Sequence, residues 1–188
     1  MKMDMNDVER VLVSEEEIKE ICQRLGAQIS KDYEDKNLLL VSVLKGSVPF
    51  MADLMRNITC DLRIDFLVVS SYSGAKTTGH VSFKKDLDIN PEGYDILVVE
   101  DILDSGLTLA YLKEILIGRN VNSVKICTFL DKQANRKANI EADYVGKQIP
   151  DEFVIGYGLD YDEKYRNLPF VGVYHQRFML TNRKGEPN

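Results

Sequence analysis

Four mainly apolar runs, separated by helical patterns, constrain the fold of this chain more than any other feature of its sequence. The runs are residues 38–44, 64–70, 95–101 and 124–130. A strand that is apolar along its length, rather than at alternate positions, is typical of a sheet covered on both faces, as parallel sheets are. We therefore expect an α/β fold in which a twisted, mainly parallel sheet is flanked by helices.

Helical signals lie between these runs. Ser14 and Glu17 form a capping box that opens one helix, and residues 107–117 form another that ends at Gly118. The expected buried face of the first helix is Ile18, Ile21, Cys22, Leu25 and Ile29. A short helix after the first run has the expected buried stripe Val48, Met51, Ala52, Leu54 and Met55. Residues 71–85 are polar and predict a long loop that can return as a hairpin.

Composition limits the number of domains and the classes of function. The chain has 188 residues and no internal repeat or linker, so we expect one domain over residues 1–188. Its net charge of −6 disfavours binding to nucleic acid, whose binders usually present a basic surface. Residues 1–13 do not resemble a signal peptide, and no apolar stretch is long enough to span a membrane. The three cysteines predict reduced, buried thiols. We expect a cytoplasmic protein that binds neither nucleic acid nor membrane.

An acidic segment at the end of the third run carries the strongest functional signal. Glu100 and Asp101 end the expected strand, and Asp104 follows in a short loop before the helix. Successive side chains along a strand point to opposite faces of the sheet, so Glu100 and Asp101 cannot both lie on the same face. Because unpaired buried charge is costly, three carboxylates within five residues indicate a binding site. A helix cap is the alternative, and it would explain Asp104 or Ser105 but not all three acids.

The loop has the features of a phosphate site. Backbone N–H groups from Asp104 to Thr108, at a helix N-terminus, are expected to form a concave set of donors. Ser105 and Thr108 add hydroxyl groups, and Gly106 lets the backbone approach a ligand closely. Two carboxylates beside this loop can accept hydrogen bonds from vicinal hydroxyls. The segment therefore predicts a site for ribose 5-phosphate.

Residues 100–108 resemble the phosphoribosyl pyrophosphate loop of the type I phosphoribosyltransferases, and residues 38–173 resemble the hypoxanthine-guanine branch of that family. The resemblance implies the type I phosphoribosyltransferase fold, with a small hood formed by terminal segments and a flexible loop. It also implies transfer of ribose 5-phosphate from phosphoribosyl pyrophosphate to 6-oxopurine bases, giving purine mononucleotides and pyrophosphate. Mg²⁺ would be the cofactor, and the enzyme would be a homodimer or homotetramer.

The resemblance also implies roles for residues that contact the purine. Asp104 would be the general base that takes a proton from the imidazole ring of the purine. Lys132 would donate to the 6-oxo group, Phe153 would stack on the base, and Val154 would read its edge through backbone groups. Arg136 would assist at the same end. A solvent-facing lysine and a plain core Phe-Val pair are the alternatives at these positions.

The remaining implied roles concern the sugar, the metal and pyrophosphate. Glu100 and Asp101 would bind the ribose hydroxyls, directly or through Mg²⁺, and Asp160 would also hold the metal. Ser71 and Tyr72 would begin a lid over residues 73–80. The full implied substrate-binding set is Lys45, Gly46, Ser71, Tyr72, Glu100, Asp101, Ile102, Leu103, Ser105, Gly106, Leu107, Thr108, Lys132, Phe153, Val154 and Arg166. Within this set, pyrophosphate would be bound by Lys45, Gly46 and Arg166.

Two other functions stay open. A xanthine-preferring enzyme would use the same residues, because the contacts that separate hypoxanthine, guanine and xanthine are largely made by backbone groups. A non-catalytic regulator that senses phosphoribosyl pyrophosphate is the other alternative. Relatives of that kind that bind nucleic acid need a basic surface or an added domain, and this acidic chain shows neither.

Overall fold

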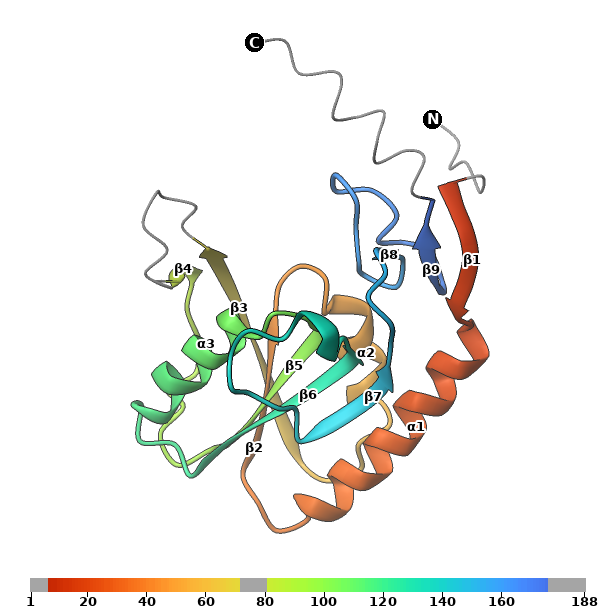
Figure 1. Ribbon diagram of the computed structural model, residues 1–188. Helices are drawn as coiled ribbons and strands as arrows, with labels where there is room; N and C mark the ends of the chain where they lie inside the picture. The colour runs from red at the N-terminus through yellow and green to blue at the C-terminus, as the bar shows by residue number, and fades with distance from the viewer. Residues whose placement is uncertain (1–6, 72–80, 176–188) are drawn as a thin grey trace, which may run out of the picture.

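The computed structural model describes residues 7–71 and 81–175. Its large sheet has the strands β2 (Leu38–Val43), β3 (Leu62–Ser71), β4 (Val81–Lys85), β5 (Asp95–Leu103), β6 (Ser123–Asp131) and β7 (Tyr144–Gln148). A small sheet has the strands β1 (Val8–Val13), β8 (Val154–Ile155) and β9 (Val171–Tyr174). The helices are α1 (Glu15–Asp32), α2 (Val48–Met55), α3 (Leu107–Ile117) and a 3₁₀ turn at Gln133–Asn135. Figure 1 shows the small sheet beyond one end of the large one.

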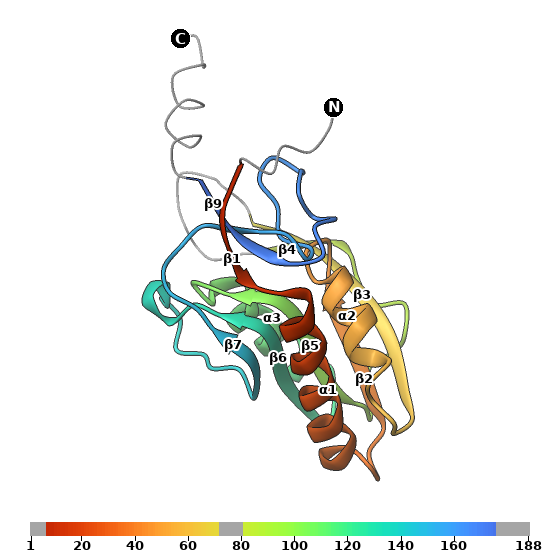
Figure 2. The ribbon, with the colours of Figure 1, turned by 90° about the vertical axis from the view of Figure 1, so that its right-hand side faces the viewer.

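The large sheet is mainly parallel and is covered on both faces. Its order is β4-β3-β2-β5-β6-β7, and only β4 runs antiparallel to its neighbour. Leu38 and Leu40 of β2 pack in the core under α1 and α2, whereas Leu39 and Val41 pack in the core under α3. Figure 2 shows α1 in front of the sheet and α3 behind it. The expected fold class is therefore confirmed.

The small sheet forms the expected hood from segments near the two ends of the chain. β1 pairs antiparallel with β9, and β9 pairs antiparallel with β8. Because the neighbouring strands β2, β5 and β6 are parallel, their carboxyl ends lie at the same edge of the large sheet. This edge faces the hood (Figure 1). The loops after these strands carry Lys45, Asp104 and Lys132.

Several local expectations are wrong. β3 is not a fully buried strand, since Arg63 and Ile64 are exposed. The pairing with β4 begins only at Val68, so the first half of β3 has a neighbour on one side only. Val48 is 44% exposed although it was expected in the core, and Phe50 is fully buried in its place.

Other local features agree with the sequence. The capping box at Ser14 is present, and α3 has the expected bounds. The three cysteines are free thiols; Cys22 and Cys127 are buried, and Cys60 is only partly buried. Within residues 7–71 and 81–175, no helix has the length and apolar character needed to cross a membrane.

Candidate active site

The turn between β5 and α3 is partly exposed and does not cap the helix with a side chain. The helix N-cap is Gly106, with φ of +77°, and no side chain caps α3. The helix-cap alternative for Asp104 and Ser105 is therefore wrong. A Cβ at position 106 would collide with the side chain of Ile140, so both the backbone angle and the packing require glycine. The Asp104 side chain is 43% exposed.

The start of α3 presents amide donors next to this turn. The Ala110 amide donates to the Gly106 carbonyl at 2.9 Å, which is the first hydrogen bond of the helix. The amides of Leu107, Thr108 and Leu109 precede that bond and have no acceptor within the helix. Such amides favour an anion at the helix N-terminus.

The acidic pair at the end of β5 is strongly perturbed by burial. Burial, and then the charge of Asp101, raises the pKa of Glu100 well above its ordinary value. Burial also raises the pKa of Asp101 to about 6, although the Ile102 amide and the Arg166 charge act against it. Within the described residues, the buried Oε2 of Glu100 has no hydrogen-bond partner. A buried oxygen of this kind is left to be satisfied by a ligand, a cation or water.

Lys132 and Asp104 meet at the end of β6. Lys132 is only 7% exposed, so the solvent-facing alternative is wrong. Its Nζ lies 3.4 Å from Asp104 Oδ2, 3.5 Å from Asp151 Oδ1 and 3.4 Å from the Glu152 carbonyl oxygen. The other oxygen of Asp104, Oδ1, is buried and has no partner within the described part of the chain.

Phe153 and Val154 have different surroundings. Val154 is buried and pairs with Val173 in the hood sheet. The Phe153 ring is 42% exposed and meets the rings of Tyr161 and Tyr174 edge-on, with centroids 5.8 and 6.0 Å away. The plain-core alternative therefore holds for the Val154 side chain and fails for Phe153, whose ring is available for stacking.

Charged side chains pair with one another at the loop after β2. Lys45 Nζ lies 3.1 Å from Glu163 Oε2. Arg166 Nη2 lies 3.3 Å from the same oxygen of Glu163 and 2.9 Å from Asp160 Oδ1. Arg166 Nη1 also donates to the Gly158 carbonyl at 2.7 Å. Two cations expected to bind pyrophosphate thus share one carboxylate.

Glycines let this loop approach the rest of the site. The Leu44–Lys45 peptide bond is cis. A Cβ on Gly46 would collide with the Asp101 carboxylate, and a Cβ on Gly158 would collide with the Gly46 carbonyl. The loops at residues 45–46 and 156–166 and the acidic pair therefore come together.

The expected metal ligands do not form a complete site by themselves. In residues 7–71 and 81–175, no three His, Cys, Asp or Glu side chains are grouped so that they could hold a metal ion. Glu100, Asp101 and Asp160 would therefore need oxygens from a substrate to complete a coordination shell. The unpartnered Glu100 Oε2 fits such an arrangement.

The lid lies mostly outside the described residues. Ser71 is the last residue of β3, and its backbone pairs with Val81 of β4. The expected hairpin return is therefore present at β4. Tyr72 and residues 73–80 lie outside the described residues.

A family model for the phosphoribosyl transferase domain matches residues 12–162 of the chain. The chain belongs to the phosphoribosyltransferase family. It is 55% identical over 169 residues to the hypoxanthine-guanine phosphoribosyltransferase of Staphylococcus aureus strain Mu50, covering 89% of this chain and 94% of that protein. It is 53% identical over 172 residues to the enzyme of that name from Bacillus subtilis, with 91% and 96% covered.

Solved structures agree with this assignment. A crystal structure of a hypoxanthine phosphoribosyltransferase from Staphylococcus aureus superposes with a TM-score of 0.90 at 53% sequence identity, covering 92% of this chain and 95% of that chain. The predicted resemblance to the hypoxanthine-guanine phosphoribosyltransferases is therefore confirmed.

Sequence reasoning found only part of what surrounds this phosphoribosyltransferase site. It placed Arg136 near the purine without finding its partners, and it missed Glu163 between Lys45 and Arg166. Asp131 is a buried carboxylate directly after the fourth apolar run, and its pairing with Arg136 was not predicted.

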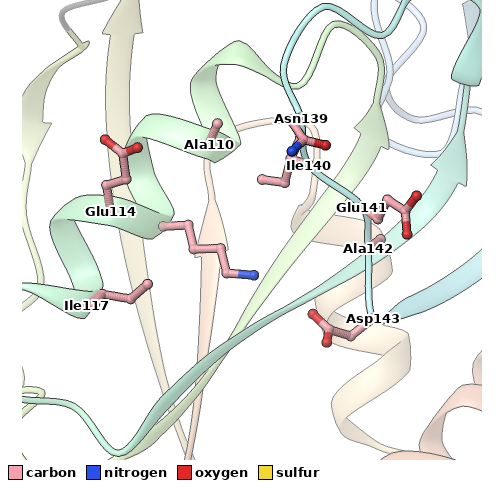
Figure 3. Close-up of a pocket in the computed structure, with 9 residues that line it drawn as sticks. Ala110, Glu114, Ile117, Asn139, Ile140, Glu141, Ala142 and Asp143 are labelled. Carbon is pink, nitrogen blue, oxygen red and sulfur yellow. The ribbon is translucent and has the colours of Figure 1, made fainter.

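A cavity of about 570 Å³ lies between α3 and residues 139–143 (Figure 3). It is lined by Ala110, Lys113, Glu114, Ile117, Asn139, Ile140, Glu141, Ala142 and Asp143. None of the expected substrate-binding residues lines it. Ile140 belongs both to this cavity and to the packing against Gly106.

Proposed function

We propose that this chain transfers the 5-phosphoribosyl group of phosphoribosyl pyrophosphate to hypoxanthine and guanine, giving IMP and GMP plus pyrophosphate, in purine salvage. The observation that carries the proposal is the approach of Lys132 Nζ to Asp104 Oδ2 at 3.4 Å. A 6-oxopurine with a free imidazole N–H needs a donor for its oxygen and an acceptor for its proton. This pair supplies both, beside the turn that would hold the ribose phosphate.

The sugar and its phosphate are bound by the end of β5 and the start of α3. The amides of residues 104–108 and the hydroxyls of Ser105 and Thr108 bind the 5′-phosphate. Glu100 and Asp101 accept from the ribose hydroxyls. With its pKa at about 6, Asp101 is mostly ionised at neutral pH and can accept a hydrogen bond or contact a cation.

The purine is held from two sides. Phe153 stacks on its face, and Lys132 donates to the 6-oxo group. The backbone around Val154 reads the edge of the base. As the new glycosidic bond forms, Asp104 takes the proton that leaves the imidazole ring, in the role of a general base.

Pyrophosphate leaves at the opposite end of the site. Lys45 and Arg166 bind its oxygens, and the backbone N–H groups around Gly46 add donors. Asp160 and the Glu100–Asp101 pair are the residues that would hold Mg²⁺. The chemistry supplied by bound Mg²⁺ is neutralisation of charge on the departing pyrophosphate. Ser71 and Tyr72 begin the lid that excludes water from the oxocarbenium-like sugar.

The enzyme has a cellular setting and an assembly state as well as an activity. It acts in the cytoplasm, as one domain that assembles into a homodimer or homotetramer. A xanthine-preferring enzyme is the second candidate, because the Lys132–Asp104 pair suits any 6-oxopurine with a free imidazole N–H.

One assay tests the proposal. Pyrophosphate release is measured with hypoxanthine, guanine, xanthine and adenine in turn, with and without Mg²⁺. We expect turnover with hypoxanthine and guanine that depends on Mg²⁺, and little turnover with adenine. Faster turnover with xanthine would assign the second candidate. Binding of phosphoribosyl pyrophosphate without turnover on any base would instead identify a regulator.

A further inference from the structure

Arg136 lies behind the turn between β5 and α3, and its hydrogen bonds go to fixed oxygens of the protein. Nε donates to the Asp104 carbonyl at 2.9 Å, and Nη1 donates to the Ile140 carbonyl at 2.6 Å. Nη2 donates to the Leu103 carbonyl at 3.2 Å and to the carboxylate of Asp131. The Arg136 and Asp131 side chains are 16% and 6% exposed. This guanidinium is therefore a fixed part of the turn rather than a surface charge.

Three successive carbonyls of the turn, those of Leu103, Asp104 and Ser105, are held from the same side. The Leu103 carbonyl accepts from the backbone amide of residue 132 at 3.0 Å in addition to Arg136. The Ser105 carbonyl accepts from the amides of residues 137 and 138 at 2.9 and 3.1 Å. All of these donors come from the segment 132–138, which follows β6.

This arrangement determines where the amides of the turn point. In a trans peptide the C=O and N–H groups lie on opposite sides of the bond. Since the carbonyls of Leu103, Asp104 and Ser105 face the segment 132–138, the N–H groups of Asp104, Ser105 and Gly106 face away from it. These amides belong to the set that would bind the 5′-phosphate.

We infer that Arg136 is a positioning residue for phosphate binding. Its guanidinium fixes the peptide planes that follow Leu103 and Asp104, so that the amides of Asp104 and Ser105 face the phosphate. The same contacts hold the backbone from which the Asp104 carboxylate reaches Lys132. The inference rests on the proposed function, because it assumes that a 5′-phosphate binds at this turn.

The experiment compares ligands that differ only in the phosphate. The affinities of IMP and of inosine are measured by calorimetry for the wild type and for Arg136→Lys. Lysine keeps the positive charge but has no planar fork to bind three carbonyls and a carboxylate together. We expect the ratio of IMP affinity to inosine affinity to fall by about tenfold or more, as for the loss of hydrogen bonds to a charged group. Inosine affinity should fall by a smaller factor, because at the purine only the position of Asp104 depends on Arg136.

The control is Arg119→Lys. Arg119 pairs with Asp86 through both terminal nitrogens, at 2.7 and 2.8 Å, and is 26% exposed. It resembles Arg136 in forming a close pair with a carboxylate, but it follows the last turn of α3 and contacts Asp86 directly after β4. The ratio of the two affinities should stay at the wild-type value in this variant. A general loss of folding would lower both affinities, not their ratio.

A second variant covers the case in which Arg136→Lys does not fold. Asp131→Asn keeps the arginine and its three carbonyl acceptors but removes its charged partner, and we expect a fall of about threefold in the ratio. A ratio at the wild-type value in the variant that folds would overturn the inference. If the wild type itself binds IMP no more tightly than inosine, the proposed function fails instead.

Discussion

At the purine and ribose end of the site, Lys132 is buried at the sheet edge, whereas at the pyrophosphate end Lys45 is exposed and belongs to a group of charged side chains that pair with one another. Lys132 is 7% exposed and contacts a carbonyl as well as carboxylates. Lys45 and Glu163, in contrast, have side chains 67% and 64% exposed and pair across two loops. Backbone oxygens cannot rearrange without moving a strand end, but exposed side chains can exchange partners freely.

This difference fits the chemistry proposed for each end. A general base and a donor to a purine must lie within hydrogen-bond distance of fixed atoms, so their positions must be fixed. Pyrophosphate must bind as part of the substrate and then leave as a product. When pyrophosphate binds, Lys45 and Arg166 would exchange the Glu163 carboxylate for pyrophosphate, and they would return to Glu163 when pyrophosphate leaves. Such an exchange suits repeated binding and release.

The largest expected effect is at the purine end. Asp104→Asn removes the proposed base without changing its size, and we expect kcat to fall by about 10²–10⁴-fold while phosphoribosyl pyrophosphate still binds. Steady-state kinetics and donor titration separate the two quantities. Asp151→Asn is the matched control, because Asp151 also lies near Lys132, at 3.5 Å. Equal losses in both variants would show that the charge around Lys132 matters and that Asp104 is not the base.

The second effect tests whether packing fixes the turn. Gly106 and Gly93 have φ of +77° and +76°, but a Cβ at 106 would collide with Ile140, whereas a Cβ at 93 would have no neighbour within 4 Å. Gly93→Ala should cost about 1 kcal/mol of unfolding free energy because of its backbone angle alone. Gly106→Ala should cost about 1–3 kcal/mol more because of the added crowding. It should also weaken IMP binding.

Chemical denaturation measures both variants. Equal losses of unfolding free energy in Gly93→Ala and Gly106→Ala, with nucleotide affinity kept in both, would show that the turn tolerates movement. The purine and ribose end of the site would then be no more fixed than the pyrophosphate end.

The fold could be predicted where the signal is local. Ser14 with Glu17 identified the start of α1, and the apolar segment ended by Gly118 gave the bounds of α3. β7 was missed because it is short and partly exposed and contains Gly146, which is needed where the strand passes the Phe129 carbonyl. Such a close approach is a property of the assembled sheet and leaves no periodic pattern in the sequence.

The site could be predicted where one segment contains it. The acids and glycine of residues 100–108 are contiguous, so their order along the chain already indicated a phosphate turn. The partners of Arg136 lie up to 33 residues away in sequence, and Glu163 lies 118 residues from Lys45. Those contacts depend on how loops from different strands meet, and composition or spacing does not encode them.

The third effect concerns Asp101, which lies between the two ends. Burial raises its folded-state pKa from the ordinary 3.8 to about 6. The folded state therefore binds this proton more tightly, and stability falls as pH rises from about 4 to 6, with the loss complete above that range. Asp101→Asn cannot ionise and should be more stable than the wild type at pH 7, by an amount on the order of 1–3 kcal/mol.

The advantage of Asp101→Asn should shrink towards pH 4, as followed by urea denaturation at each pH. Binding of phosphoribosyl pyrophosphate should weaken in the same variant, because the carboxylate that accepts from the ribose is lost. A stability difference that does not depend on pH would contradict the role of burial.

The smallest expected effect is at Glu163. Hydrogen bonds from Lys45 and then Arg166 lower the pKa of Glu163, so at neutral pH it is ionised and competes with pyrophosphate for these two cations. Glu163→Gln should tighten pyrophosphate binding by about two- to fivefold, within the range of exposed ion pairs. The gain should diminish as salt is added, because exposed charges are screened. Asp162→Asn, in the same turn but paired with Lys164 at 3.4 Å, should leave pyrophosphate affinity unchanged. If Glu163→Gln weakens binding instead, the carboxylate orients Lys45 and Arg166 for the ligand, and the pyrophosphate end is preorganised in the same way as the purine end.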